Sequence, residues 1–110
     1  MIYFLHAPGY KLIKIGYSTN VEKRIHDITS TMPFVELKCL RIIDGQPSQE
    51  RKLHLKFQDL RLNNSEWFKA EGKLLNYIFD PKNTNTEFHL NDFIASIFPH
   101  GYCAKILNKY

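Results

Sequence analysis

Five polar side chains in the first half of the chain carry groups that can bind phosphate, transfer protons or ligate a metal ion. A guanidinium offers planar, paired donors that stay charged at any working pH, and a carboxylate supplies the oxygen ligands that Mg²⁺ prefers. A phenol ionises only near a pKa of ~10, so it needs a positive charge or a metal nearby to act as a base. The five residues are Tyr3, Lys14, Arg24, Glu50 and His54.

Each of these residues also has an ordinary structural explanation when it is taken alone. An aromatic side chain such as Tyr3 is common in strands, and a basic one such as Arg24 often covers apolar neighbours on a helix surface. A glutamate in the first turn of a helix, such as Glu50, usually compensates the helix dipole. The functional interpretation therefore depends on the combination and order of the residues.

The chain is moderately basic, and its positive charge is unevenly distributed. Fifteen Lys and Arg against eleven Asp and Glu give 110 residues a net charge of +4 and an isoelectric point near 9.1. Residues 1–79 hold twelve basic and eight acidic side chains, whereas residues 80–110 hold three of each. An excess of this kind suits a polyanionic partner, and it lies in the first two-thirds of the chain.

Several classes of protein are disfavoured by composition. A hydrophobic content of 44% can fill a core, so the chain is not wholly disordered. Cys39 and Cys103 are too few and too isolated for a disulfide framework or a zinc site. No apolar run approaches the ~18 residues that span a bilayer, and no signal-peptide pattern is present. We therefore expect a cytoplasmic, reduced protein without a membrane function.

The elements that must position the polar side chains begin with a predicted β-hairpin. Residues 1–6 and 12–17 are rich in β-branched and aromatic side chains, and the Pro-Gly pair at 8–9 favours a type II turn in which glycine supplies the positive φ. Alternation places Lys14 on the face opposite Ile13 and Ile15. Antiparallel pairing of the hairpin can then bring Lys14 close to Tyr3.

A predicted helix follows the hairpin, and a third strand follows the helix. Thr19 and Glu22 read as a capping box, which begins a helix with Arg24 beside its apolar stripe. Residues 34–43 alternate as the third strand. The members of the apolar stripe are Val21, Ile25 and Ile28.

Two further helices complete an α+β fold with a three-stranded antiparallel sheet flanked by helices. Pro47 begins the second helix, which carries Glu50, His54 and Arg61 along its flank. A third helix is expected over residues 70–79. We assign residues 1–79 to one domain and 80–110 to a short C-terminal extension of unknown role, with a polar linker at 82–89 and a short helical pattern after residue 91.

This order of elements and residues resembles the GIY-YIG nuclease superfamily. Met1-Ile2-Tyr3 stands at the GIY position and Lys14-Ile15-Gly16 at the YIG position, with Arg24 eight residues later and Glu50 opening the second helix. The run Glu50-x-x-Leu53-His54-x-x-Phe57, followed by Arg61 and Glu66-Trp67-Phe68, is similar to a small phage-enriched subfamily that writes YIG as KIG. The resemblance covers residues 1 to about 68.

The resemblance implies a metal-dependent endonuclease that hydrolyses DNA phosphodiester bonds. Tyr3 would hold or deprotonate the attacking water, with Lys14 assisting it or acting as the base itself. Arg24 would clamp the phosphate, and Glu50 would ligate Mg²⁺, for which Mn²⁺ can substitute. His54 would orient that carboxylate or protonate the leaving group.

Contacts with the nucleic acid are expected from a set that overlaps the catalytic one. Trp67 and Phe68 are interpreted as core residues in preference to a base-stacking platform. Ile28 stands where many members of the superfamily carry His or Tyr, which leaves that role to His26 or His54. The expected DNA-binding residues are Arg24, Lys14, Tyr17 and Arg61.

An alternative interpretation keeps the fold but not the activity. In it, the chain is a catalytically weak or inactive GIY-YIG-fold module that binds DNA or another protein. In either case no specificity domain is visible, so target choice would depend on the tail, on a homodimer or on a protein partner. If the protein is phage-encoded, it acts in the cytoplasm of a bacterial host.

Overall fold

A four-stranded antiparallel sheet forms the centre of the fold. The computed structural model describes residues 1–80, with the strands in the order β3-β1-β2-β4. The α+β class is confirmed, but the predicted three strands are corrected to four, because a three-residue strand pairs with the outer edge of the hairpin. The strands are β1 (Ile2–Ala7), β2 (Leu12–Tyr17), β3 (Lys38–Ile43) and β4 (Trp67–Lys69), and the helices are α1 (Val21–Thr31), α2 (Pro47–Lys56) and α3 (Gly72–Phe79).

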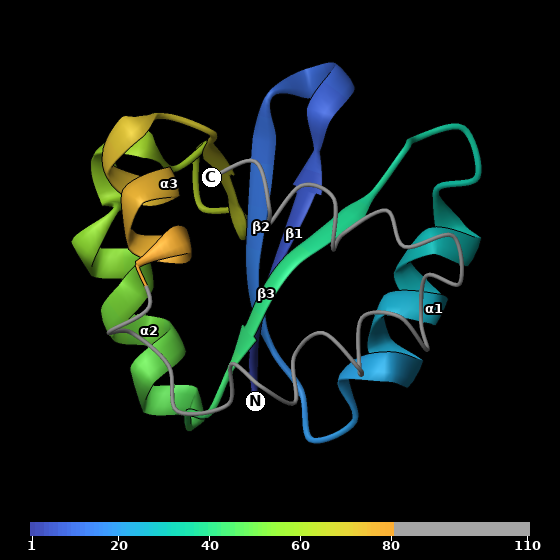
Figure 1. The fold of residues 1–110 in the computed structure, drawn as a ribbon, viewed down its shortest axis with the longest axis horizontal. Helices are drawn as coiled ribbons and strands as arrows, with labels where there is room; N and C mark the ends of the chain where they lie inside the picture. Colours follow the sequence, from blue (N-terminus) through green and yellow to red (C-terminus); the bar gives the residue numbers. More distant parts are fainter. Residues whose placement is uncertain (81–110) are drawn as a thin grey trace.

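Helices cover both faces of the sheet, so the fold has two hydrophobic cores. Figure 1 shows α1 on one side of the sheet and α2 with α3 on the other. Side chains of β1 alternate between the two cores: Ile2 and Phe4 pack on the side of α2 and α3, whereas Tyr3 and Leu5 pack on the side of α1. The face of the hairpin that carries Tyr3 is therefore the face that α1 covers.

The hairpin pairing brings the two motif segments into register. Tyr3 stands opposite Gly16, and Leu5 stands opposite Lys14. Because directly opposed residues of an antiparallel pair share a face, Lys14 and Gly16 lie on the same face as Tyr3. The predicted alternation is confirmed, since Ile13 and Ile15 are buried in the other core.

The hairpin turn differs from the prediction. Its three residues, Pro8–Tyr10, form a 3₁₀ turn closed by the N–H of Lys11, which donates to the Pro8 carbonyl. The left-handed residue is Lys11, with φ 54°. The expected type II turn with a positive φ at Gly9 is therefore wrong.

The start of α1 is displaced by one residue from the predicted capping box. The N-cap is Asn20, whose side-chain oxygen accepts from the Lys23 N–H at 3.1 Å, so Thr19 and Glu22 do not form the box. Asparagine is among the best N-cap residues because its short side chain reaches that donor. The apolar stripe is confirmed: Val21 and Ile25 are buried, and Ile28 packs beside them.

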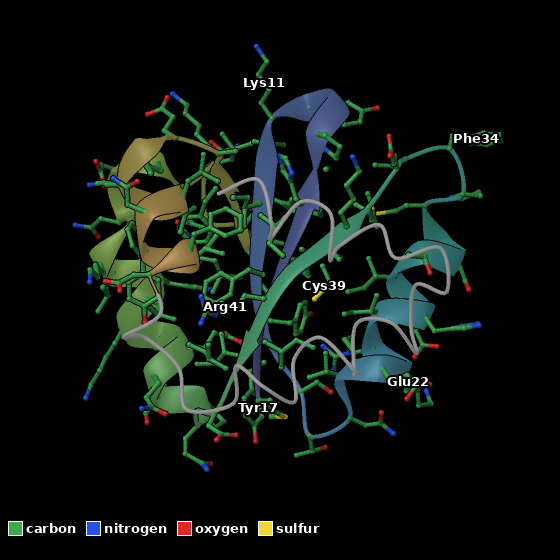
Figure 2. The ribbon with its side chains drawn as sticks, viewed as in Figure 1. Lys11, Tyr17, Glu22, Phe34, Cys39 and Arg41 are labelled. Carbon is green, nitrogen blue, oxygen red and sulfur yellow. The ribbon has the colours of Figure 1, made fainter. Side chains whose placement is uncertain are left out.

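The third strand is shorter than the sequence pattern indicates. It begins at Lys38, which pairs with His6, rather than at Phe34, because the preceding residues form a turn in which the Val35 N–H donates to the Met32 carbonyl. Phe34 instead stands 98% exposed at the outer end of the loop after α1, whereas Cys39 points into the core (Figure 2).

The remaining boundaries differ by a few residues. The second helix ends at Lys56, so the prediction that Arg61 lies on its flank is wrong: Arg61 follows a separate 3₁₀ turn, Gln58–Leu60. The third helix begins at Gly72. No helix within residues 1–80 is both long enough and apolar enough to cross a bilayer. The predicted linker at 82–89 and the helical pattern after residue 91 lie outside the described residues.

Candidate functional site

Tyr3 and Gly16 form the closest contact of the candidate site. The Tyr3 side chain is fully buried, and a Cβ built on Gly16 would lie 2.3 Å from both Cζ and Oη of Tyr3. The phenol ring therefore lies directly across the backbone of Gly16. A side chain at position 16 would clash with the ring in this position. This clash explains sterically why the KIG segment ends in glycine.

The Tyr3 hydroxyl is buried without a hydrogen bond of normal geometry within residues 1–80. Burial raises the pKa of the Tyr3 phenol above 10.0, while the approaching Arg24 guanidinium acts in the opposite direction and the carboxylates of Glu66 and Glu50 raise the pKa further. A buried polar group without a partner is uncommon in folded proteins and is often found at functional sites. Arg24, Glu50 and Glu66 thus lie close enough to Tyr3 to influence its ionisation.

Lys14 is held at the edge of this group by an ion pair. Its ammonium donates to the carboxylate of Glu66, and it also lies 5.8 Å from the ring centre of Trp67. The side chain of Lys14 is only 15% exposed, whereas that of Glu66 is 44% exposed. Sequence reasoning gave no role to Glu66, although Glu66-Trp67-Phe68 is part of the run that resembles the nuclease subfamily.

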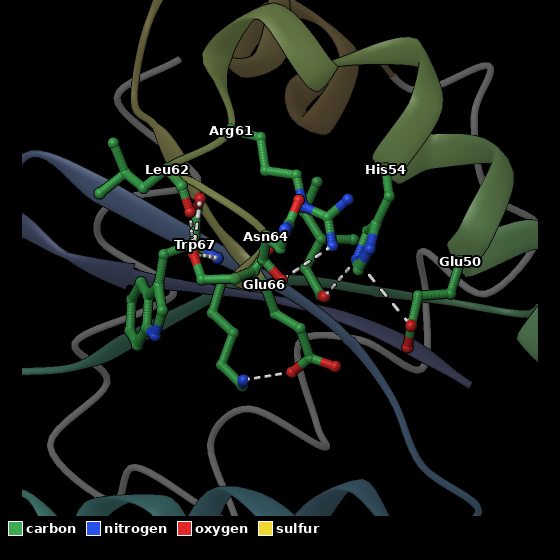
Figure 3. A network of polar contacts seen from close by, with 10 residues as sticks. Glu50, His54, Arg61, Leu62, Asn64, Glu66 and Trp67 are labelled. Carbon is green, nitrogen blue, oxygen red and sulfur yellow. Dashed lines mark hydrogen bonds and ion pairs between the residues drawn. The ribbon is translucent and has the colours of Figure 1, made fainter.

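His54 connects α2 to the outer edge of β2. Its Nε2 lies 2.9 Å from the carbonyl oxygen of Ile15, and its ring packs 5.1 Å from the ring of Phe68. Because a carbonyl only accepts, Nε2 carries the hydrogen of this bond. Glu50 Oε1 is 3.9 Å from the same nitrogen, so the imidazole and the Glu50 carboxylate lie next to each other (Figure 3).

The backbone N–H and carbonyl of Ile15 that face the outer edge of β2 are both hydrogen-bonded, one to the loop before β4 and one to α2. Its N–H donates to the carbonyl of Glu66 at 3.1 Å, while its carbonyl receives the bond from His54. His54 therefore continues the β2 edge beyond the point where β4 ends. Glu50 and Glu66 are fixed to the sheet through this one residue.

Arg61 organises the loop before β4. Its Nε donates to the Ser65 carbonyl at 2.6 Å, and its second terminal nitrogen donates to the Asn64 carbonyl at 3.2 Å (Figure 3). These bonds hold the loop that leads into Glu66. Arg61 is thus engaged with the protein backbone at the position where a DNA contact is expected.

The other predicted side chains are dispersed. Tyr17 packs against the core beneath α2 and α3, on the face away from Tyr3. His26 is exposed on α1. Within residues 1–80, Arg24 and Glu50 both act on Tyr3, Lys14 is connected to this group through Glu66, and His54 lies next to Glu50.

Glu50 is the residue of this group best suited to a metal ion. Its side chain is 17% exposed, and no cluster of three or more His, Cys, Asp or Glu within residues 1–80 could enclose an ion. Mg²⁺ is commonly held by one or two carboxylates together with water and substrate phosphate. Glu50 supplies one such carboxylate, and it acts on the same Tyr3 phenol that the Arg24 guanidinium approaches.

The T5orf172 domain matches the chain over residues 1–83. The match covers all the strands and helices described above. No curated protein and no solved structure matches the chain.

Removing the buried hydroxyl should stabilise the fold. We expect Tyr3→Phe to raise the free energy of unfolding by about 1 kcal/mol at pH 7, because an unpaired buried hydroxyl is costly. The folded protein keeps a phenolic proton that the unfolded chain releases near pH 10.0, so the wild type should also lose stability as the pH rises from about 10 through the raised pKa. This contribution should be missing in Tyr3→Phe.

Urea unfolding between pH 7 and 11 measures both effects. Tyr10→Phe is the matched control, since Tyr10 is 65% exposed and should change neither quantity. A loss of stability in Tyr3→Phe would contradict the assignment of an unpaired hydroxyl.

A methyl group at position 16 should displace the Tyr3 ring. We expect Gly16→Ala to lower the free energy of unfolding by about 1–3 kcal/mol, the usual cost of overpacking. Gly9→Ala is the control, because nothing lies within 4 Å of a Cβ at that position. In a Tyr3→Ala background the cost of Gly16→Ala should largely disappear, and purely additive effects would show that the two residues are not coupled.

Proposed function

The chain belongs to the T5orf172 domain family, which is phage-associated and related to the GIY-YIG nucleases, and we propose that it is a metal-dependent endonuclease acting on DNA. The observation that carries the proposal is the buried Tyr3 hydroxyl, unpartnered within residues 1–80 and approached by Arg24. A stable core would place a phenylalanine there. Retaining a costly hydroxyl beside a guanidinium and two carboxylates supports a role for that oxygen in chemistry.

In this proposal Arg24 binds the phosphate and Tyr3 activates the attacking water. The Arg24 guanidinium offers paired donors to the phosphate oxygens and places positive charge where the transition state gains negative charge. The same charge favours the ionised form of Tyr3, because it acts to lower a pKa that burial raises. Tyr3 Oη then positions the attacking water and accepts its proton.

Lys14 supplies charge in this proposal, and Tyr3 is the base. The Lys14 side chain donates to the Glu66 carboxylate, so it is engaged in an ion pair and is not free to accept a proton from water. Glu66 holds Lys14 by this ion pair on the face of the sheet where Tyr3 lies. Lys14 therefore helps to hold the phosphate.

Glu50 is the proposed ligand of Mg²⁺, with Mn²⁺ as a substitute. A divalent ion held there would stabilise the leaving oxygen of the phosphodiester. His54 acts through Glu50: its Nε2–H is committed to the Ile15 carbonyl, so it fixes α2 against the sheet and is a positioning residue.

Nicking of a supercoiled plasmid in Mg²⁺ or Mn²⁺ tests the proposal. Glu50→Gln should slow nicking by about 100-fold or more, because it removes the carboxylate charge while preserving the shape of the side chain. Glu71→Gln, at an exposed position before α3, should nick at the wild-type rate.

Two results would count against the enzyme. Nicking that persists in Glu50→Gln would show a contaminant or a wrongly assigned ligand. Absence of nicking at every metal and pH, with salt-sensitive DNA binding retained, would instead favour the inactive DNA-binding module.

The role of Lys14 can be separated from that of a base by substitution with arginine. Lys14→Arg should keep nicking within about 10-fold of the wild type, because arginine retains the charge but does not deprotonate in proteins. Lys14→Met should lose about 100-fold. Lys52→Met, exposed on α2, is the control for removal of a positive charge. Equal and complete loss in the first two variants would assign the base to Lys14.

A further inference from the structure

An apolar groove lies on the same face of the sheet as Tyr3, at the opposite end of the hairpin. It has a volume of about 420 Å³ and opens between the hairpin tip, the end of α1 and the loop before β4. Its lining is mainly hydrophobic and includes Ala7, Tyr10, Leu12, Met32, Val35 and Trp67.

The aromatic side chains around this groove are unusually exposed. Tyr10 on the hairpin tip is 65% exposed, and Phe34, on the loop that also carries Met32 and Val35, is 98% exposed and points outward (Figure 2). Exposed apolar surface of this kind commonly marks a binding site. Trp67, interpreted from the sequence as a core residue, lines the groove, whereas Phe68 is fully buried as expected.

The groove lies on the same face of the sheet as the proposed catalytic residues Tyr3 and Lys14. Tyr3 and Ala7 lie on one face of β1, four residues apart, which corresponds to about 13 Å along a strand. On β2, Lys14 and Leu12 lie on the same face and follow the same direction from the Tyr3 end towards the groove. The Lys14 ammonium lies 5.8 Å from the Trp67 ring centre. Trp67 thus borders both a phosphate-binding cation and the groove.

We propose that this groove binds an unstacked nucleobase of the DNA strand, within about four nucleotides of the bond that is cut. The distance follows from ~13 Å along the sheet and ~3.4 Å per nucleotide of a stacked strand. Aromatic rings stack on bases of any sequence, and the neighbouring cation holds the backbone. This inference rests on the proposed function and adds a substrate class: DNA with unpaired or distorted nucleotides beside the scissile bond.

An apolar protein segment is the less suitable occupant. Such a segment would not need the Lys14 ammonium beside Trp67, whereas a nucleotide presents a base and a phosphate at that spacing. Asn63, which also lines the groove, carries an amide that can pair with a base edge.

Trp67 is the single tryptophan of the chain, so its fluorescence reports on the groove directly. The full-length protein is titrated in EDTA with a short single-stranded oligonucleotide, with the same strand carrying abasic sites, and with the matched duplex. The intact strand should quench Trp67 and bind about 10-fold more tightly than the other two. Tyr10→Ala should weaken binding of the intact strand by a similar factor, while Leu55→Ala, equally exposed on α2, should not.

Equal affinity for intact and abasic strands, with unchanged Trp67 emission, would overturn the proposal and leave an apolar protein segment as the occupant. Plasmid nicking separates this outcome from failure of the enzyme. Nicking without base-dependent quenching removes the groove but keeps the nuclease. Base-dependent quenching without nicking keeps the groove as part of a DNA-binding protein.

Discussion

The packing of the Tyr3 ring across Gly16 is the constraint on which the candidate site depends. It follows from the antiparallel register, which sets a residue without a side chain opposite the largest buried side chain of the α1 face. A register shift of one residue would turn every hairpin side chain to the other face of the sheet. It would therefore bury Lys14 among the hydrophobic side chains beneath α2.

The outer edge of β2 fixes the positions of the other residues of the site relative to the hairpin. A three-residue β4 leaves the end of β2 open, and Ile15 binds Glu66 through its N–H and His54 through its carbonyl. An exposed strand edge presents unpaired backbone groups that can pair with another chain, and native proteins often cover it. Here a helix and a loop complete the edge, and they bring carboxylates from two parts of the sequence beside Tyr3.

Most of the fold is predictable from the sequence because its signals are local. The hairpin alternation and the α1 stripe depend on neighbouring residues, and both are confirmed. The fourth strand is too short for alternation to reveal, since three residues form it only because β2 offers an edge. Similarly, Lys14 and Glu66 are fifty-two positions apart, and no local sequence pattern predicts that they form an ion pair.

The balance of charge inside the site explains why bulk electrostatics is a poor guide to its function. Lys14 and Arg24 offer two positive charges, and Glu50 and Glu66 offset them, although the chain as a whole carries +4. These four formal charges cancel, so the net charge of the whole chain does not describe the charge at this point. Under the proposed function, a divalent ion on Glu50 turns the local balance positive, so that phosphate binding and metal binding favour each other. In that case the geometry that places Glu50 beside Arg24 and Tyr3 controls both steps.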